Sequence, residues 1–405
     1  MNAFVSSSIT KKYGTSVSKS TKRNIHEMNL LPNDELMTRS QVLQNNPLVQ
    51  IISFAAAFRI GARISVINQP RMPKISTSVG STVTRLPSGA RVRLFYPTTS
   101  TKDDEAETIM ASYCTDGRQT SDGMAGLVGF RQLGLSFLLA HLATASSGCI
   151  QDAPTISSSK EEEDGLPLLI YSHGYGGNMD MATYFFRTMA SKGIIIAALE
   201  HTDGTASSTV LKNGRERKFN QYFMTGRQQL TQRASELLEA AEYIPEMIQA
   251  NYTTAISNIM LGGHSYGCPS AIMAANGVSA DKTQIDGLIL HDPALGMGYG
   301  MLPPNGSTSR IPTISYTSDE YNRANVRYGD LTLHVKGCFH GNFVDAALWA
   351  PSIIMRTLSL VIPAAGPTDP MTIHEELASS ALAFLKSKDP FDPKVQIGDL
   401  FEFIR

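Results

Sequence analysis

The sequence predicts an α/β fold with a mostly parallel central sheet and helices on both faces. From about residue 166 onward, short apolar runs alternate with stretches of helical periodicity, the pattern of strands joined by crossover helices. One apolar run ends in a Gly-x-Ser-x-Gly turn, "GGHSYG", followed directly by a helix-like segment. The chain of 405 residues is 42% hydrophobic, so it can bury a sizeable core.

The expected strands are short apolar runs bounded by turn residues. Residues 81–89, "STVTRLPSG", and 90–97, "ARVRLFYP", predict an entry hairpin joined by Pro-Ser-Gly turn chemistry. The further predicted strands span residues 166–172, 194–200, 255–261, 286–290, 311–317 and 331–336. The polar, turn-rich stretch 146–165 is expected to be a surface loop.

The predicted helices are segments in which apolar residues recur at spacings of three and four. They span residues 124–144, 179–193, 227–248, 268–276 and about 372–387. Pro269 falls in the first turn of its helix, where proline is tolerated. Together with the strands, these helices form one predicted domain, residues 75–405.

The first 74 residues differ from this domain. Residues 1–46 hold no apolar run of signal-peptide length and begin rich in Ser and Lys, so we expect a disordered tail or an organelle-targeting segment. Residues 47–74 are apolar and basic, and Arg59 and Arg63 interrupt the apolar run before it reaches membrane-spanning length. We expect a helix that packs on the core or lies on a lipid surface, in a cytoplasmic protein whose membrane association stays open.

Composition excludes some function classes. The chain has 35 basic and 36 acidic residues, so its charge gives no case for nucleic-acid binding. The widely spaced cysteines predict free thiols in a reducing compartment; they are Cys114, Cys149, Cys268 and Cys338. Histidines and cysteines do not cluster at metal-ligand spacing, so we expect neither a metal nor a cofactor. The oligomeric state stays open.

Ser265 is the predicted nucleophile. It lies between Gly263 and Gly267, after a strand and before a helix, which is the setting of the nucleophile elbow in α/β-hydrolases. Glycines are needed there because a serine in a strained turn brings neighbouring backbones too close for a flanking Cβ. Its hydroxyl needs a histidine to take the proton and a carboxylate to orient that histidine, both expected downstream.

Four histidines, His291, His334, His340 and His374, follow Ser265 in the chain. His340 lies on the loop "CFHGNF" after the last β-run, whereas His334 lies within that strand and His374 opens a polar helix. His340 is therefore the predicted general base.

Two strand ends supply candidate acids. "GLILHDPA" contains Asp292, and "PTISYTSDEY" contains Asp319 and Glu320. Both strand ends can reach the same histidine, because they are neighbours in the predicted sheet. From the residues alone, the two strand ends remain equal candidates.

The oxyanion formed in acyl transfer needs preorganised N–H donors. The backbone N–H of Tyr266, directly after the nucleophile, is the first predicted donor. The second is expected from Tyr175 in the loop "SHGYGG", residues 172–177, where Gly174 and Gly176 let the backbone turn.

Several blocks together resemble the platelet-activating-factor acetylhydrolase family, also known as lipoprotein-associated phospholipase A2. They are "RVRLFYPT", "LPLLIYSHGYGG", "ALEHTDGTAS", "GGHSYG", "LHDPA" and "GCFHGNF", within about residues 75–390. The block at 200–207, "EHTDGTAS", is the most specific, because general lipases and esterases do not carry it.

The resemblance implies an α/β-hydrolase fold and favours Asp292 over Asp319 as the acid that acts with Ser265 and His340. It also implies the oxyanion role of Tyr175 and Tyr266. The expected activity is calcium-independent hydrolysis of short or oxidised sn-2 acyl groups of glycerophospholipids, as in a 1-alkyl-2-acetylglycerophosphocholine esterase. A phospholipid substrate further implies a surface that faces lipid.

Two other interpretations stay open. A general carboxylesterase of the dienelactone-hydrolase or polyesterase kind would share the elbow but lack the 200–207 block. A non-catalytic α/β-hydrolase-like binding protein is the other, and a complete Ser, Asp and His set in chain order argues against it.

Overall fold

The structure, a computed structural model, describes residues 72–404 apart from short gaps. The gaps are residues 74, 76, 101–108, 128–129, 132–133, 155, 157–164, 278–283, 306–310, 351–354, 356–364 and 397. The chain divides into two units, and all described residues belong to the second, Ile51–Arg405. The predicted tail at 1–46 and nearly all of the predicted helical segment at 47–74 lie outside the described residues, so both stay predictions.

In the described part of the chain, eleven strands form one sheet. In sheet order they are β13 (Phe401–Ile404), β12 (Leu331–Val335), β11 (Thr313–Thr317), β10 (Gly287–His291), β9 (Ile256–His264), β5 (Leu166–Ser172), β6 (Ile195–Glu200), β2 (Arg91–Pro97), β1 (Val79–Arg85), β4 (Ser146–Gln151) and β3 (Met110–Ser112). The run from β12 to β6 is parallel throughout, and β13 and β2 pair antiparallel at its two ends. The predicted mostly parallel sheet is confirmed.

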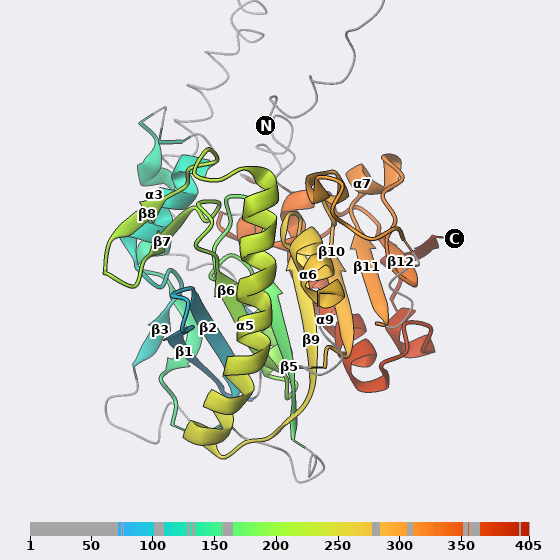
Figure 1. The fold of residues 1–405 in the computed structure, drawn as a ribbon, viewed down its shortest axis with the longest axis horizontal. Helices are drawn as coiled ribbons and strands as arrows, with labels where there is room; N and C mark the ends of the chain where they lie inside the picture. Colours follow the sequence, from blue (N-terminus) through green and yellow to red (C-terminus); the bar gives the residue numbers. More distant parts are fainter. Residues whose placement is uncertain are drawn as a thin grey trace, which may run out of the picture. The chain divides into compact units, whose positions relative to one another are not determined.

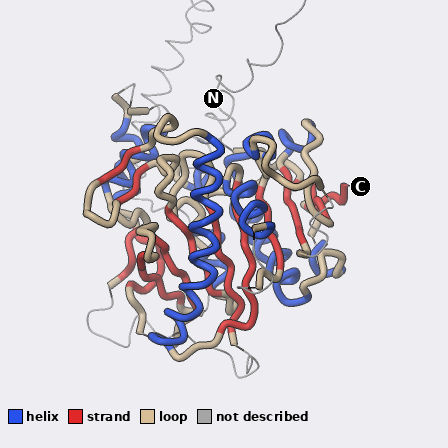
Figure 2. Tube along the Cα trace, viewed as in Figure 1, coloured by secondary structure: helices blue, strands red, loops and turns tan. Residues whose placement is uncertain are grey.

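Helices cover both faces of this sheet (Figures 1 and 2). The described α-helices are α3 (Arg118–Leu127), α4 (Thr183–Ala190), α5 (Gly226–Tyr252), α6 (Gly267–Asn276), α7 (Asp319–Arg323) and α9 (Pro370–Ser387). In Figure 1, α5 and α6 lie in front of the sheet and α9 lies behind it. None of the helices in the described residues is long and apolar enough to span a membrane.

The core lies in two layers, one under each set of helices. Leu168 and Ile170 of β5 pack in the cluster that includes α5 and α6. Leu169 and Tyr171 of the same strand pack in the cluster that includes α4 and α9. Successive side chains of a strand point to opposite faces, so β5 is apolar throughout because both of its faces are covered.

The predicted helix at 124–144 is wrong. The structure has α3 at Arg118–Leu127, and two short 3-10 helices follow at Ser136–Leu138 and Ala140–Ala143. Between them the chain passes through Gly134, whose φ of 69° lies in the left-handed region that favours glycine. The apolar residues that suggested one long helix instead pack as a separate small cluster with Trp349 and Ala347.

The predicted loop at 146–165 is wrong in its first part. Residues Ser146–Gln151 form β4, which pairs parallel with β1 and antiparallel with β3. Inward-facing Ser147 and Cys149 are fully buried, and the Ser147 hydroxyl donates to the Ala111 carbonyl at 2.8 Å. The sequence did not predict this strand, because its small side chains give no apolar alternation.

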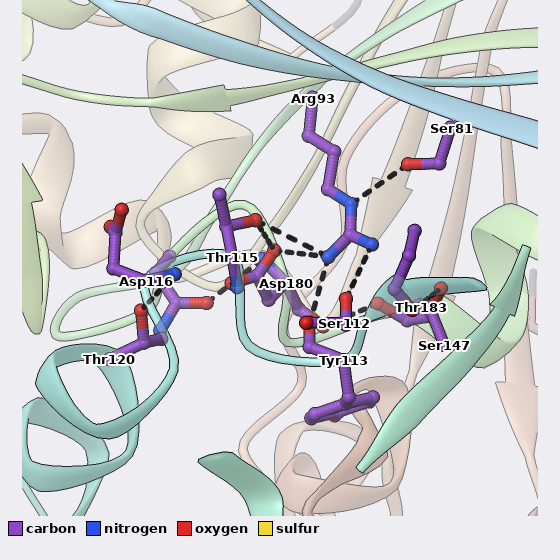
Figure 3. A network of polar contacts seen from close by, with 12 residues as sticks. Ser81, Arg93, Ser112, Tyr113, Thr115, Asp116, Thr120, Ser147, Asp180 and Thr183 are labelled. Carbon is purple, nitrogen blue, oxygen red and sulfur yellow. Dashed lines mark hydrogen bonds and ion pairs between the residues drawn. The ribbon is translucent and has the colours of Figure 1, made fainter. Parts of the chain in front are cut away.

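A buried ion pair between Arg93 and Asp180 holds the chain in place just after the 172–177 loop (Figure 3). Arg93 of β2 lies 2.6 Å from Asp180, and both side chains are almost completely buried. The guanidinium also donates to Ser81 and to the Tyr113 carbonyl, while Asp180 accepts from Thr115. A buried ion pair is tolerated when its remaining polar atoms have partners, as they do here.

Candidate active site

Ser265 lies in a sharp turn between β9 and α6. Its φ is 55°, a left-handed backbone conformation that is strained for a residue with a Cβ. A Cβ added at Gly263 would overlap the backbone of Gly267, and one added at Gly267 would overlap the Ser172 carbonyl oxygen. Both glycines of the Gly-x-Ser-x-Gly motif are therefore required by close backbone approach, the geometry of a nucleophile elbow.

The 172–177 loop lies against this elbow. Ser172, at the end of β5, pairs with Gly263, at the end of β9, so the two turns leave neighbouring strand ends. A Cβ added at Gly174 would lie 3.2 Å from the Ser265 Cβ. The structure thus brings the two predicted oxyanion segments beside the predicted nucleophile.

Tyr175 and Tyr266, the predicted oxyanion residues, also contact each other. Their rings lie edge to face with centroids 5.8 Å apart. In the described part of the chain, the Tyr266 backbone N–H has no hydrogen-bond acceptor, so it can serve an incoming oxygen. The loop behind Tyr175 is fixed by the Gly176 N–H, which donates to the Thr205 carbonyl at 2.7 Å.

His340 and Asp292 form a hydrogen bond at the same edge of the sheet. His340 Nδ1 lies 2.5 Å from Asp292 Oδ2, and the Asp292 side chain is fully buried. The other carboxylate oxygen, Oδ1, accepts the Ser318 backbone N–H at 2.8 Å. Because Nδ1 is held by the carboxylate, Nε2 is the imidazole nitrogen left to take a serine proton.

The other three downstream histidines have different surroundings. His291 is buried with its Nδ1 2.8 Å from the Tyr171 hydroxyl, and burial lowers its pKa to about 3. His334 lies between Asp319, at 2.7 Å, and a second carboxylate on β13. His374 is fully buried, and burial lowers its pKa to about 4.

The second candidate strand end does not hold the histidine ring. Asp319 Oδ1 lies 2.7 Å from His334 Nε2 and also accepts the Gly337 backbone N–H at 3.1 Å. Glu320 accepts the backbone N–H of His340 at 2.7 Å, so it contacts that residue without contacting the imidazole. Of the two strand ends that the sequence left equal, the one with Asp292 contacts the His340 ring.

A buried cluster below the 172–177 loop was not predicted as part of the site. Arg233 of α5 is fully buried and lies 2.9 Å from Asp203, and it donates to the His173 carbonyl at 2.6 Å. Burial alone would raise the pKa of Asp203, but Arg233, His201 and the hydrogen bonds from Thr205 together outweigh it, so the pKa is lowered. His201 in turn lies 2.7 Å from Glu236.

This cluster explains the 200–207 block. The block supplies Asp203, whose partner Arg233 holds the loop and lies with its Cζ 4.7 Å from the Tyr266 ring. The signal was present in the sequence as "EHTDGTAS", but its partner on α5 is about 30 residues away and no local pattern connects them.

The free thiols predicted for the four cysteines are confirmed, and all four are buried.

Comparison with known proteins gives the following matches. The sequence profile of the family described as "Platelet-activating factor acetylhydrolase, isoform II" matches residues 78–399. A dog (Canis lupus familiaris) protein named platelet-activating factor acetylhydrolase is 30% identical over 171 residues, which are 40% of this chain and 36% of that protein. A bovine (Bos taurus) protein of the same name is 25% identical over 358 residues, 76% of each chain.

A solved structure also resembles this one. A ferulic acid esterase from Streptomyces cinnamoneus superposes with a TM-score of 0.57 at 17% sequence identity. The match covers 83% of this chain and 99% of that one. At this identity the likeness concerns the fold alone, and it confirms the α/β-hydrolase fold class. The family match spans every strand and helix that carries Ser265, Asp292 and His340.

Proposed function

Because this chain belongs to the platelet-activating factor acetylhydrolase isoform II family, we propose that it hydrolyses carboxylic esters through an acyl-enzyme on Ser265. In this proposal His340 is the general base, Asp292 orients it, and the backbone N–H groups of Tyr175 and Tyr266 bind the oxyanion. The observation that carries the proposal is the 2.5 Å contact between His340 and Asp292 at the strand ends beside the strained Ser265.

The reaction has two halves that use the same groups. Ser265 Oγ attacks the ester carbonyl while His340 Nε2 takes its proton, and the negative oxygen of the tetrahedral intermediate accepts the two backbone N–H groups. The intermediate collapses, the C–O bond to the alcohol breaks, and His340 returns the proton to the leaving oxygen. Water, deprotonated by His340, then attacks the acyl-enzyme. The bond from the acyl carbon to Ser265 Oγ breaks, His340 returns the proton to Ser265 Oγ, and the carboxylic acid is released.

We propose a glycerophospholipid with a short or oxidised sn-2 acyl group as the substrate. Family membership supports this, together with aromatic side chains around the elbow: Tyr299 packs edge to face on Tyr266, and Phe219 packs edge to face on Tyr175. Every group in the proposed reaction is a side chain or backbone group of this chain. We therefore expect hydrolysis to continue in a calcium chelator.

Contact with a lipid surface is a further part of the proposal. Tyr222 is 86% exposed and Phe223 is 41% exposed, just before α5, and Tyr299 is 37% exposed. Aromatic side chains with one polar end suit a membrane–water interface. We propose a cytoplasmic protein that meets membranes at this face. The expectation that residues 47–67 lie on a lipid surface stays a prediction.

A general carboxylesterase of the dienelactone-hydrolase or polyesterase kind is the alternative. It would share Ser265, Asp292 and His340 but would be indifferent to the phospholipid headgroup. The 200–207 block favours the phospholipase, because a general carboxylesterase is expected to lack it. In this chain its Asp203 pairs with Arg233, which holds the oxyanion loop.

A series of phosphocholine lipids with increasing sn-2 acyl length, assayed in a calcium chelator, separates the two. A steep fall in kcat/KM beyond short chains supports the phospholipase. Equal rates for the phosphocholine lipid and a neutral ester of the same acyl group support the general carboxylesterase. Hydrolysis of neither would favour the non-catalytic interpretation.

A further inference from the structure

The short helix α7 contacts the proposed base and acid although it supplies neither of them. Its N-cap residue, Ser318, donates its backbone N–H to Asp292 Oδ1 at 2.8 Å. Glu320 accepts the His340 backbone N–H at 2.7 Å. Tyr321 lies with its ring 5.1 Å from the His340 ring, centroid to centroid, and the two planes differ by only 10°.

Tyr321 also lies near the proposed nucleophile. Burial raises the pKa of the Tyr321 phenol, with a smaller contribution from the nearby Asp292, and a side-chain hydrogen bond with Ser265 opposes the rise only in part. The phenol is therefore neutral at physiological pH. The Tyr321 side chain thus stacks on the imidazole of His340 and lies near the Ser265 side chain.

The position of Tyr321 is itself fixed by the turn that carries it. Its backbone N–H donates to the Ser318 hydroxyl at 3.1 Å, which caps the helix. The Asp319 backbone N–H donates to the Cys338 carbonyl at 2.8 Å, so α7 is bonded to the loop that carries His340. The helix that carries the tyrosine ring is therefore hydrogen-bonded directly to the histidine loop.

The stacked ring of Tyr321 can restrain the tilt of the His340 imidazole, which the Asp292 carboxylate alone cannot do. Asp292 holds one nitrogen of the imidazole, but a single contact leaves the ring able to tilt about it. A face-to-face neighbour limits that tilt, and an aromatic face also favours the imidazolium that forms during proton transfer. His264 lies against the same imidazole, with centroids 4.5 Å apart, at an angle of 35°.

We propose that Tyr321 is a positioning residue for His340, with its stacked ring holding the imidazole in line with Ser265 and Glu320 anchoring the backbone of the base. This inference rests on the proposed serine mechanism. The carboxylates that the sequence raised as alternative acids thereby receive another role: Glu320 anchors the base, and Asp319 ties α7 to Gly337.

The test compares Tyr321→Leu, which removes the aromatic ring, with Tyr321→Phe, which keeps it. Steady-state kinetics use a soluble acetyl ester, and a fluorophosphonate measures the second-order rate of Ser265 modification without lipid binding. We expect Tyr321→Leu to lower kcat by about 10- to 100-fold with little change in KM, since small misplacement of a catalytic group has effects of this size. The fluorophosphonate rate should fall in parallel, and Tyr321→Phe should recover most of both losses.

Tyr243→Leu is the matched control, because Tyr243 is half-buried on α5 outside the proposed site. Equal losses in Tyr321→Leu and Tyr321→Phe would overturn the role of the ring, as would a change confined to KM. Wild-type rates in Tyr321→Leu would overturn it as well.

A second pair keeps the inference testable if Tyr321→Leu unfolds. Glu320→Ala removes the acceptor of the His340 N–H, whereas Glu320→Gln keeps an acceptor oxygen. We expect a lower kcat in the alanine variant and recovery in the glutamine variant, and equal rates in both would contradict the anchor. Ser265→Ala, assayed beside them, separates a failure of the serine mechanism from a failure of the Tyr321 inference. If Ser265→Ala retains hydrolysis, the serine mechanism itself fails, whatever the Tyr321 variants show.

Discussion

Arg233 donates a 2.6 Å hydrogen bond to the backbone carbonyl of His173, so a side chain of α5 holds the loop that carries the proposed oxyanion donor Tyr175. The guanidinium is fully buried and paired with Asp203. The 200–207 block, the most specific block of the sequence, therefore supports the loop that carries Tyr175. It does not contact the substrate in the proposed reaction.

Removing one partner of this buried pair should cost more than removing both. Arg233→Met leaves the Asp203 carboxylate buried without its cation, and we expect a loss of about 3 to 5 kcal/mol in the free energy of unfolding. Arg233→Met combined with Asp203→Asn should recover part of that loss. Denaturant unfolding of the two single variants and the double variant measures the coupling, and strictly additive losses would contradict a direct interaction.

The acid assignment predicts unequal effects of two matched substitutions. Asp292→Asn should lower kcat by about 10⁴-fold, because the amide cannot hold His340 in the tautomer that accepts a proton at Nε2. Asp319→Asn should change kcat by only a few-fold, since Asp319 contacts His334. Both are measured with the same acetyl ester, and a crippled Asp319→Asn beside an active Asp292→Asn would reverse the assignment.

The glycines at the two ends of α6 should differ sharply in tolerance. In Gly267→Ala the new Cβ would overlap the Ser172 carbonyl, so we expect destabilisation by about 1 to 3 kcal/mol and loss of activity as the elbow shifts. In Gly277→Ala the nearest atoms would lie 3.4 Å away, an ordinary contact. Thermal unfolding and esterase rates of the two variants test this, and a fully active, stable Gly267→Ala would be incompatible with the described turn.

Asp345 follows the His340 loop, and its buried carboxyl group should make the free energy of unfolding depend on pH. Burial raises its pKa to about 8, although hydrogen bonds from Tyr113 and the backbone lower it in part. A carboxyl group with a raised folded-state pKa favours folding below its unfolded pKa of about 4, and this contribution is lost as the pH rises toward 8.

Asp345→Asn removes this titration while keeping an acceptor for the Tyr113 hydroxyl, which lies 2.9 Å away. We expect the unfolding free energy of the wild type, relative to the variant, to fall by more than about 1 kcal/mol between pH 5 and pH 8.5. Histidines away from Asp345 titrate in both proteins and cancel in the difference. His374, whose Nε2 lies 4.0 Å from Asp345 Oδ1, has a folded-state pKa of about 4, below this pH range. A difference that does not change with pH would show that Asp345 is ionised in the folded state.

The sequence predicted most of the parallel sheet, because strands such as β5 and β10 are buried on both faces and read as continuous apolar runs. The predicted elements were wrong where the side chains of a strand are small or where a glycine lets the backbone turn. Ser147 and Cys149 give β4 no apolar pattern, and Gly134 interrupts an apolar stretch that otherwise has helical spacing.

The site was predictable to the extent that its groups follow local rules. Ser265 has a motif, and Asp292 and His340 each follow a strand, so their convergence could be expected from a parallel sheet. The choice between Asp292 and Asp319 needed a family resemblance, because both strand ends meet at the same edge. Arg233 and Tyr321 could not be found, since a salt bridge across 30 residues and a ring stacked through space leave no mark on spacing.

In the proposed mechanism, Ser265 carries the acyl group. Acid-quenching the protein during turnover of an acetyl ester, followed by mass spectrometry of its peptides, tests this most directly. We expect the acetyl group on the peptide that contains Ser265, accumulating further in Asp292→Asn if deacylation becomes slow, and neither label nor turnover in Ser265→Ala. Turnover that persists in Ser265→Ala, or an acetyl group that forms on another residue, would contradict the claim.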